Sequence, residues 1–225
     1  MAETNTVTGA HHAAFAHQFD DPEQQRQAGA LGMWVFLATE VLFFGGLFTA
    51  YTIYRLANPE VFAVASNELD LTLGFINTLV LICSSFTMAT AVYNAQHGNR
   101  KWLIFFLCAT VVLGMVFLGI KAVEYAQKFE HHLVPGAHFS IEGTDPNKAQ
   151  MFFSLYFAMT GLHALHMIIG AGMMIVLIAM AWRNRFSPEY HTPVELGGLY
   201  WHFVDIIWIF LFPLLYLLGR STIGH

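Results

Sequence analysis

The last long apolar run of the chain, residues 196–218, carries two ionisable side chains, His202 and Asp205. At ~1.5 Å per residue, a helix over this run covers about 34 Å, enough to cross a hydrocarbon core of roughly 30 Å. Asp205 would then lie about 13 Å from the start of the run, near the middle of the membrane. The two residues are three apart and share one helical face. A carboxyl group at that depth costs ~2.5–3.5 kcal/mol on insertion scales, so both should face protein or a wet cavity.

A second carboxyl group, Glu40, interrupts the apolar run over residues 31–54. It lies about 14 Å into that run, at a depth similar to that of Asp205. We expect it to form a hydrogen bond with a neighbouring helix. Both a structural hydrogen bond and a proton-carrying role fit an acid in this position, and we assign Glu40 the greatest functional weight of the buried carboxyl groups.

His163 and His166 lie three apart on one face of an apolar run over residues 150–182. With the imidazole and carboxyl groups named above, they could form a cluster of the kind that iron or zinc binds. Interhelical hydrogen bonds would use the same side chains without a metal. The paired Glu-x-x-His repeat of di-iron bundles is absent, so we favour an intramembrane polar network and expect no metal on this chain.

Lys121 and Glu124 are also three apart, near the end of the apolar run over residues 102–125. They lie about 30 Å or more from the basic start of that run, at ~1.5 Å per residue. We therefore expect an i, i+3 ion pair at the outer membrane interface.

The composition indicates which elements must position these groups. Hydrophobic residues make up 56% of the 225 residues and charged residues only 11%, against about 25% charged in a soluble domain. Five apolar runs each reach the ~20 residues that a spanning helix needs. The sequence therefore predicts an all-α polytopic membrane protein, a bundle of five transmembrane helices over residues 31–54, 71–95, 102–127, 150–183 and 196–219.

Residues 1–30 lack the basic start and apolar core of a signal peptide, so we expect a polar N-terminal tail ahead of a transmembrane domain over residues 31–225. The two short turns on the N-terminal side of the bundle are dense in Arg and Lys, whereas the opposite loops are longer and contain few. This contrast predicts that the N-terminus is inside and the C-terminus outside. The formal net charge of −5 offers no basic patch for nucleic acid.

Five segments resemble, in order, subunit III of the haem-copper terminal oxidases, the cytochrome c and quinol oxidases. The first is the helix that bears Glu40, with Ala-Thr-Glu-Val-Leu-Phe-Phe over residues 38–44. Asn77-Thr78 and Glu124-Tyr125 follow, and then the Gly-Leu-His-Ala-Leu-His stretch over residues 161–166. The most specific segment is Tyr-Trp-His-Phe-Val-Asp over residues 200–205.

This resemblance implies a non-catalytic subunit of a bacterial respiratory oxidase in the cytoplasmic membrane. Its partners would be chiefly subunit I, which reduces oxygen and pumps protons, then subunit II, small subunits and membrane lipids. The haems and copper would lie on those partners, and this chain would have no catalytic centre of its own. It would support proton uptake, stability and turnover of subunit I. Many members of the family have seven helices and hold phospholipid in a cleft between them. The five-helix pattern of this chain resembles that of bacterial quinol oxidases. Both cytochrome c and quinol stay open as the electron donor.

Two other classes of protein fit some of the same residues. A self-contained membrane electron-transfer protein would bind haem or metal through His163, His166 and His202. A proton-coupled transporter would need Glu40 and Asp205 to line an alternating cavity, but no matching halves are evident in the sequence.

Overall fold

The structure is a computed structural model that describes residues 22–136, 139–141 and 143–217. In these ranges it has six α-helices, a short π-helix and no β-strand. Five of the helices are long and apolar enough to cross a membrane, which confirms the predicted all-α bundle of five spans. The elements are α1 (Pro22–Ala57), α2 (Pro59–Asn67), α3 (Leu71–Gln96), α4 (Arg100–Glu130), α5 (Pro146–Trp182), α6 (Thr192–Phe212) and the π-helix η1 (Pro213–Leu217).

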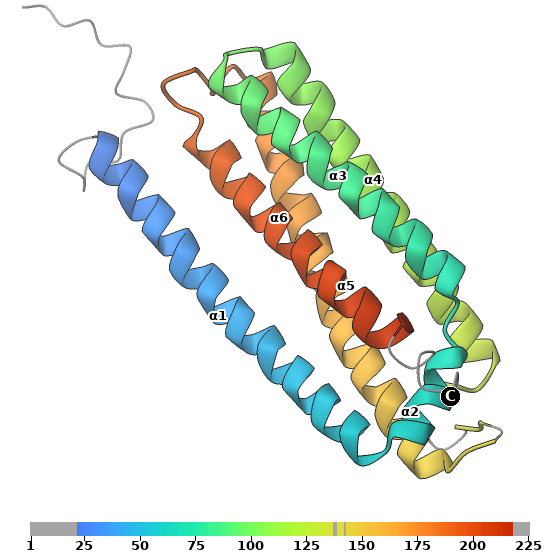
Figure 1. The fold of residues 1–225 in the computed structure, drawn as a ribbon. Coiled ribbons are helices and arrows are strands. Elements are labelled where there is room, and N and C mark those ends of the chain that lie inside the picture. The colour runs from blue at the N-terminus through green and yellow to red at the C-terminus, as the bar shows by residue number, and fades with distance from the viewer. Residues whose placement is uncertain (1–21, 137–138, 142, 218–225) are drawn as a thin grey trace, which may run out of the picture.

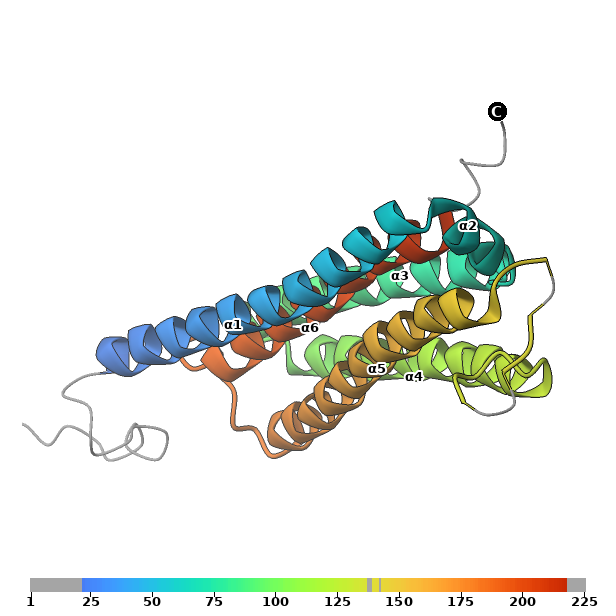
Figure 2. The same ribbon diagram turned by 90° about the horizontal axis from the view of Figure 1, so that it is seen from below.

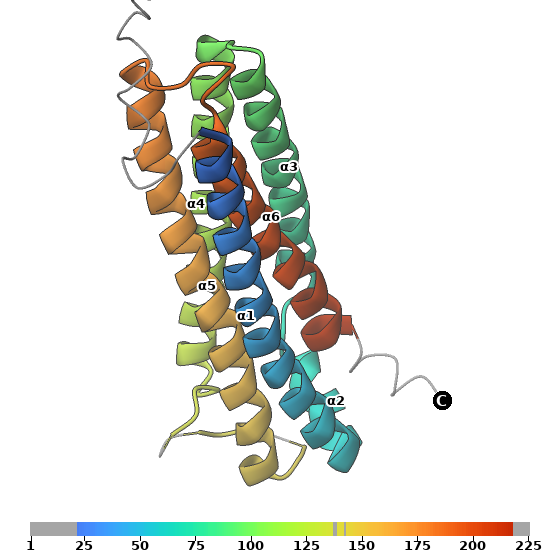
Figure 3. The ribbon, with the colours of Figure 1, turned by 90° about the vertical axis from the view of Figure 1, so that its left-hand side faces the viewer.

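The five long helices run side by side, with α6 at the centre and α1 at one edge (Figure 1). Helix α6 contacts α1, α3 and α5, and the views from below and from the side place α3 and α4 on the far side of α6 from α1 (Figures 2 and 3). In the most apolar 18-residue stretch of the last span, Thr192–Leu217, 61% of the residues are buried, whereas the corresponding share for α1 is 11%. The helix that carries His202 and Asp205 is therefore the core of the bundle.

Local sequence signals explain where several helices begin. The Asp70 carboxylate accepts hydrogen bonds from the backbone N–H groups of Thr72 and Leu73, and the Asp145 carboxylate accepts one from Asn147. Such N-caps satisfy backbone donors that the first turn leaves without partners. Helices α2, α5 and α6 also have proline in their first turn, where its fixed φ suits helix initiation.

Two boundaries differ from those expected. Helix α1 begins at Pro22 and so extends into the segment predicted as a polar tail, the rest of which lies outside the described residues. An exposed ion pair between Glu23 and Arg26, one turn apart, supports this polar start. The short helix α2 occupies the loop before α3, and its Phe62 and Ala65 are buried against the bundle. Hydrophobic length alone detects neither feature, because both lie outside the apolar runs.

Trp201 of α6 is, with Trp208, one of the two largest fully buried side chains among the described residues. Its indole N–H donates a 2.9 Å hydrogen bond to the Ser84 hydroxyl of α3. The ring lies against two glycines: a Cβ atom on Gly114 of α4 would come within 2.8 Å of it, and one on Gly170 of α5 within 3.1 Å. Small residues on the neighbouring helices thus make room for the tryptophan.

Candidate functional site

The structure brings Glu40 of α1 and His166 of α5 together inside the bundle. Glu40 Oε2 lies 3.2 Å from His166 Nε2, and the two side chains are 20% and 12% exposed. The other ring nitrogen, Nδ1, lies 2.8 Å from the backbone carbonyl oxygen of Leu162. The Tyr200 hydroxyl of α6 donates a 3.0 Å hydrogen bond to the backbone oxygen of His166, so three helices position this imidazole.

Counting hydrogen atoms defines the chemistry of this pair. The Leu162 oxygen can only accept, so His166 Nδ1 must carry a hydrogen. One further hydrogen must then lie between Nε2 and the Glu40 oxygen, because neither a bare nitrogen nor a carboxylate can donate. That hydrogen belongs either to a carboxylic acid beside a neutral imidazole or to an imidazolium beside a carboxylate. The pair shares one proton, and its total charge is zero in both forms.

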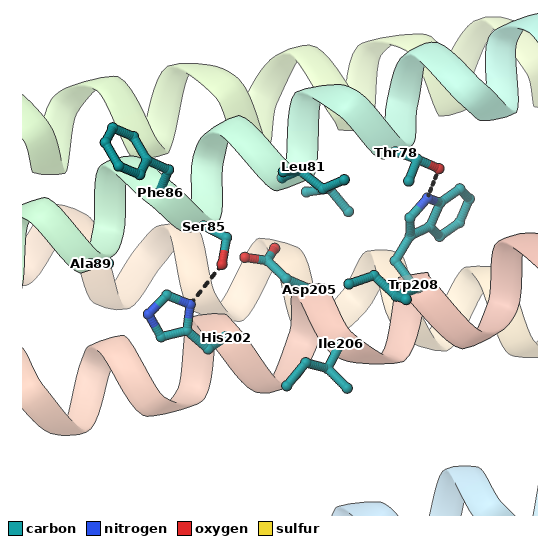
Figure 4. Close-up of a pocket in the computed structure, with 11 residues that line it drawn as sticks. Thr78, Leu81, Ser85, Phe86, Ala89, His202, Asp205, Ile206 and Trp208 are labelled. Carbon is teal, nitrogen blue, oxygen red and sulfur yellow. Dashed lines mark hydrogen bonds between the residues drawn. The ribbon is translucent and has the colours of Figure 1, made fainter.

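His202 and Asp205 face α3 rather than the Glu40 pair (Figure 4). His202 Nδ1 lies 2.8 Å from the Ser85 hydroxyl. Asp205 is only 3% exposed, and neither of its carboxyl oxygens has a hydrogen-bond partner among the described residues. Asp205 is therefore buried and His202 partly buried, and together they form a second polar site at the boundary between α3 and α6.

His163 occupies a third, apolar environment. Its ring centroid lies 5.4 Å from that of Phe117 and 5.2 Å from that of Trp208. The residue is 1% exposed, and neither ring nitrogen has a hydrogen-bond partner among the described residues. The four groups predicted as one network, together with Glu40, thus divide into three separate environments.

Lys121 and Glu124 form the expected ion pair, with 2.8 Å between Nζ and Oε2, and protein side chains enclose it. The side chains are 5% and 0% exposed. The Tyr156 and Tyr216 hydroxyls both donate to Glu124 Oε1, at 2.9 and 2.5 Å, and the ammonium also lies within 3.1 Å of both hydroxyl oxygens. The ammonium is 5.1 Å from the ring centroid of Trp208 as well. The pair is therefore an internal polar centre that joins α4, α5, α6 and η1.

Sequence reasoning missed the tyrosines of this centre. Tyr216 has the features of an interfacial anchor, and Tyr156 lies in the apolar run that begins the fourth span. Lys128, one helical turn beyond Glu124, is also only 5% exposed, and its ammonium donates to the backbone oxygen of Glu68 before α3. Lys121, Glu124 and Lys128 follow one another at spacings of three and four residues, which places all three on one face of α4. This spacing is the signal in the sequence that could have indicated a shared polar face.

In the part of the chain that the structure describes, no three or more His, Cys, Asp or Glu side chains come together in an arrangement that could hold a metal ion. The three intramembrane histidines contact different neighbours: Glu40, Ser85 and a pair of aromatic rings. Their geometry is therefore that of side chains packed or hydrogen-bonded between helices.

These features define a polytopic helical membrane protein with polar groups in its interior. Comparison with known proteins specifies the family: the family model described as cytochrome c oxidase subunit III matches residues 2–220. The chain is 36% identical over 198 residues to cytochrome c oxidase subunit 3 of Thermostichus vulcanus, covering 84% of this chain and 87% of that one. It is 29% identical over 206 residues to a probable quinol oxidase subunit 3 of Staphylococcus haemolyticus, and the match covers 91% of this chain and 96% of that one.

The chain therefore belongs to the cytochrome c oxidase subunit III family, which lies within the haem-copper oxidases and confirms the resemblance seen in the sequence. Membership of this family implies a multisubunit oxidase assembly.

Proposed function

We propose that this chain is a non-catalytic subunit that supports proton uptake, stability and sustained turnover of subunit I, the oxygen-reducing and proton-pumping subunit. The haems and copper lie on the partner subunits. The chain lies in a bacterial cytoplasmic membrane with its N-terminus inside and its C-terminus outside. Subunit I is its main neighbour, beside subunit II, small subunits and membrane lipids.

The observation that carries this proposal is the shared proton of Glu40 and His166. The pair is partly exposed, in the apolar span of α1, and it can pass a hydrogen between two atoms 3.2 Å apart without changing its total charge. Ionisable groups within membrane spans are costly and often mark proton pathways. A neutral pair lowers that cost while it keeps a transferable proton close to the edge of the bundle.

The test is the sustained turnover of the purified oxidase complex with Glu40 replaced by Ala or by Gln. We expect both variants to assemble and to start at the normal rate, because the oxygen-reducing centre lies on subunit I. The number of turnovers before inactivation should fall roughly five- to tenfold in both variants, a factor equivalent to about 1–1.4 kcal/mol. Oxygen consumption followed over many cycles gives this number.

Glu60→Gln is the matched control, because Glu60 is an exposed carboxyl group in α2. That variant should behave as the unmodified complex does. The Gln variant separates proton sharing from packing, since an amide keeps the size and a hydrogen bond but cannot exchange a proton. An unchanged number of turnovers in the Gln variant would contradict the proton-sharing role and leave Glu40 a structural residue alone.

A further inference from the structure

A groove with a volume of about 470 Å³ lies between α3 and α6. At its floor are the polar side chains of Thr78, Ser85, His202 and Asp205, as the close-up shows (Figure 4). Its rim is formed by aliphatic and aromatic side chains of the same two helices, among them Phe86 and Ile206. The groove therefore combines an apolar mouth with a polar floor.

The polar floor is incomplete within this chain. The Thr78 hydroxyl already accepts the Trp208 indole N–H at 3.1 Å, and Ser85 is bonded to His202 at 2.8 Å. Asp205 is only 3% exposed, and the Ser85 hydroxyl, the nearest donor on the floor, is engaged with His202, so neither carboxyl oxygen has a well-formed hydrogen bond among the described residues. A buried carboxyl group without a hydrogen-bond donor is unfavourable, so the site requires a donor from outside the described chain.

The surroundings restrict where that donor can come from. Phe86 is 72% exposed and Ile206 50% exposed, both within spans long and apolar enough to cross the membrane. Water is scarce at that depth, and lipid acyl chains contain no hydrogen-bond donor. Ala89 and Ser85 are small, which lets another helix approach the groove closely. An α-helix can enter the bilayer at this depth because all its backbone N–H and C=O groups are hydrogen-bonded within the helix.

We propose that this groove receives a transmembrane helix of another subunit of the oxidase, which places a side-chain N–H or O–H donor beside Asp205. The partner helix is apolar on the face that meets Phe86 and Ile206, and it carries one Asn, Gln, Ser, Thr, Trp or cationic residue at the depth of Asp205. This inference rests on the proposed function, because it names a contact through which the chain joins the assembly.

Photo-crosslinking in the intact complex tests the contact. A photoreactive phenylalanine analogue replaces Ile206 at the rim, and in a control it replaces Ile169 on α5, which is 53% exposed and outside the groove. From position 206 we expect an adduct to a single transmembrane peptide of another subunit, identified by mass spectrometry, and we expect that peptide to be absent from the control. Adducts to lipid alone, to a second copy of this chain, or to the same peptide from both positions would overturn the proposal.

Asp205→Leu tests the role of the carboxyl group. Removing a buried group that has no partner should leave the thermal unfolding temperature of the full chain in detergent unchanged or higher. Retention of the crosslinked partner subunit during detergent washing should fall about tenfold. Asp205→Asn, which keeps a polar acceptor, should retain most of the partner. Equal retention in the Leu variant and the unmodified complex would overturn the proposal.

The outcomes separate this inference from the function on which it depends. A chain that purifies without any haem-bearing subunit contradicts the proposed function. A chain that purifies with such a subunit, but labels only lipid from position 206, contradicts the docking helix alone.

Discussion

Replacing Glu124 by Leu should lower the free energy of unfolding by about 3–5 kcal/mol, the usual cost of removing one partner from a buried ion pair. The Lys121 side chain is 5% exposed, and among the described residues Glu124 is the charged partner within hydrogen-bond distance of its ammonium. The two tyrosine hydroxyls that donate to Glu124 would lose their acceptor in the same step. Helices α4 and α5 and the π-helix η1 would therefore lose their common polar contact.

Unfolding of the full chain in mixed detergent micelles measures this change. Glu130→Leu is the control, because Glu130 is an exposed carboxyl group at the end of the same helix. We expect the control to change the stability little. A double variant, Lys121→Leu with Glu124→Leu, should recover much of the loss, since no isolated charge is left. Equal stability of the Glu124 variant and its control would contradict the buried centre.

Gly114→Val should lower the free energy of unfolding by about 1–3 kcal/mol, as expected when a well-packed core is overfilled. A Cβ atom at position 114 would lie 2.8 Å from the Trp201 ring, closer than side chains tolerate. The ring cannot move freely, because it is hydrogen-bonded to Ser84 on one side and lies against Gly170 on the other. The substitution therefore separates α4 from α6.

Gly119→Val is the matched control, on the same helix and with open space around its Cβ position. Both changes carry the same backbone and propensity effect, so the difference between their unfolding free energies reports the contact with Trp201. Trp201→Phe in the Gly114→Val background should restore part of the loss, because a smaller ring leaves room for the added methyl groups. Identical effects at the two glycines would show that the ring does not limit this interface.

The number and order of the spans could be predicted from the sequence, because apolar length is the quantity that a bilayer selects. The depth of Glu40 in its span also follows from counting residues. Its contact with His166 does not, since depth leaves open which faces of two helices meet. Packing decides this, through the Tyr200 bond to the His166 backbone and the edge-on contact of Phe44 with the imidazole ring.

The buried ion pair shows most clearly what one-dimensional reasoning lacks. Lys121 and Glu124 lie at the end of an apolar run, where counting residues predicts the outer membrane interface and says nothing of enclosure by other segments. In the folded chain α4 continues to Glu130, and Tyr156 and Tyr216 arrive from segments far away in sequence. The helix α2 and the Lys128 contact with Glu68 cover this end of the bundle as well. Only tertiary structure reveals that these groups are enclosed.

Purification of the tagged chain from native membranes tests the central claim most directly, through a visible spectrum and the mass of every co-purifying polypeptide. The account predicts haem absorption in constant ratio to this chain while a larger, many-helix partner subunit is bound. When the two are separated, the absorption should stay with the partner and be absent from this chain. A stoichiometric haem band on the isolated chain, or purification with no haem-bearing partner, would contradict it.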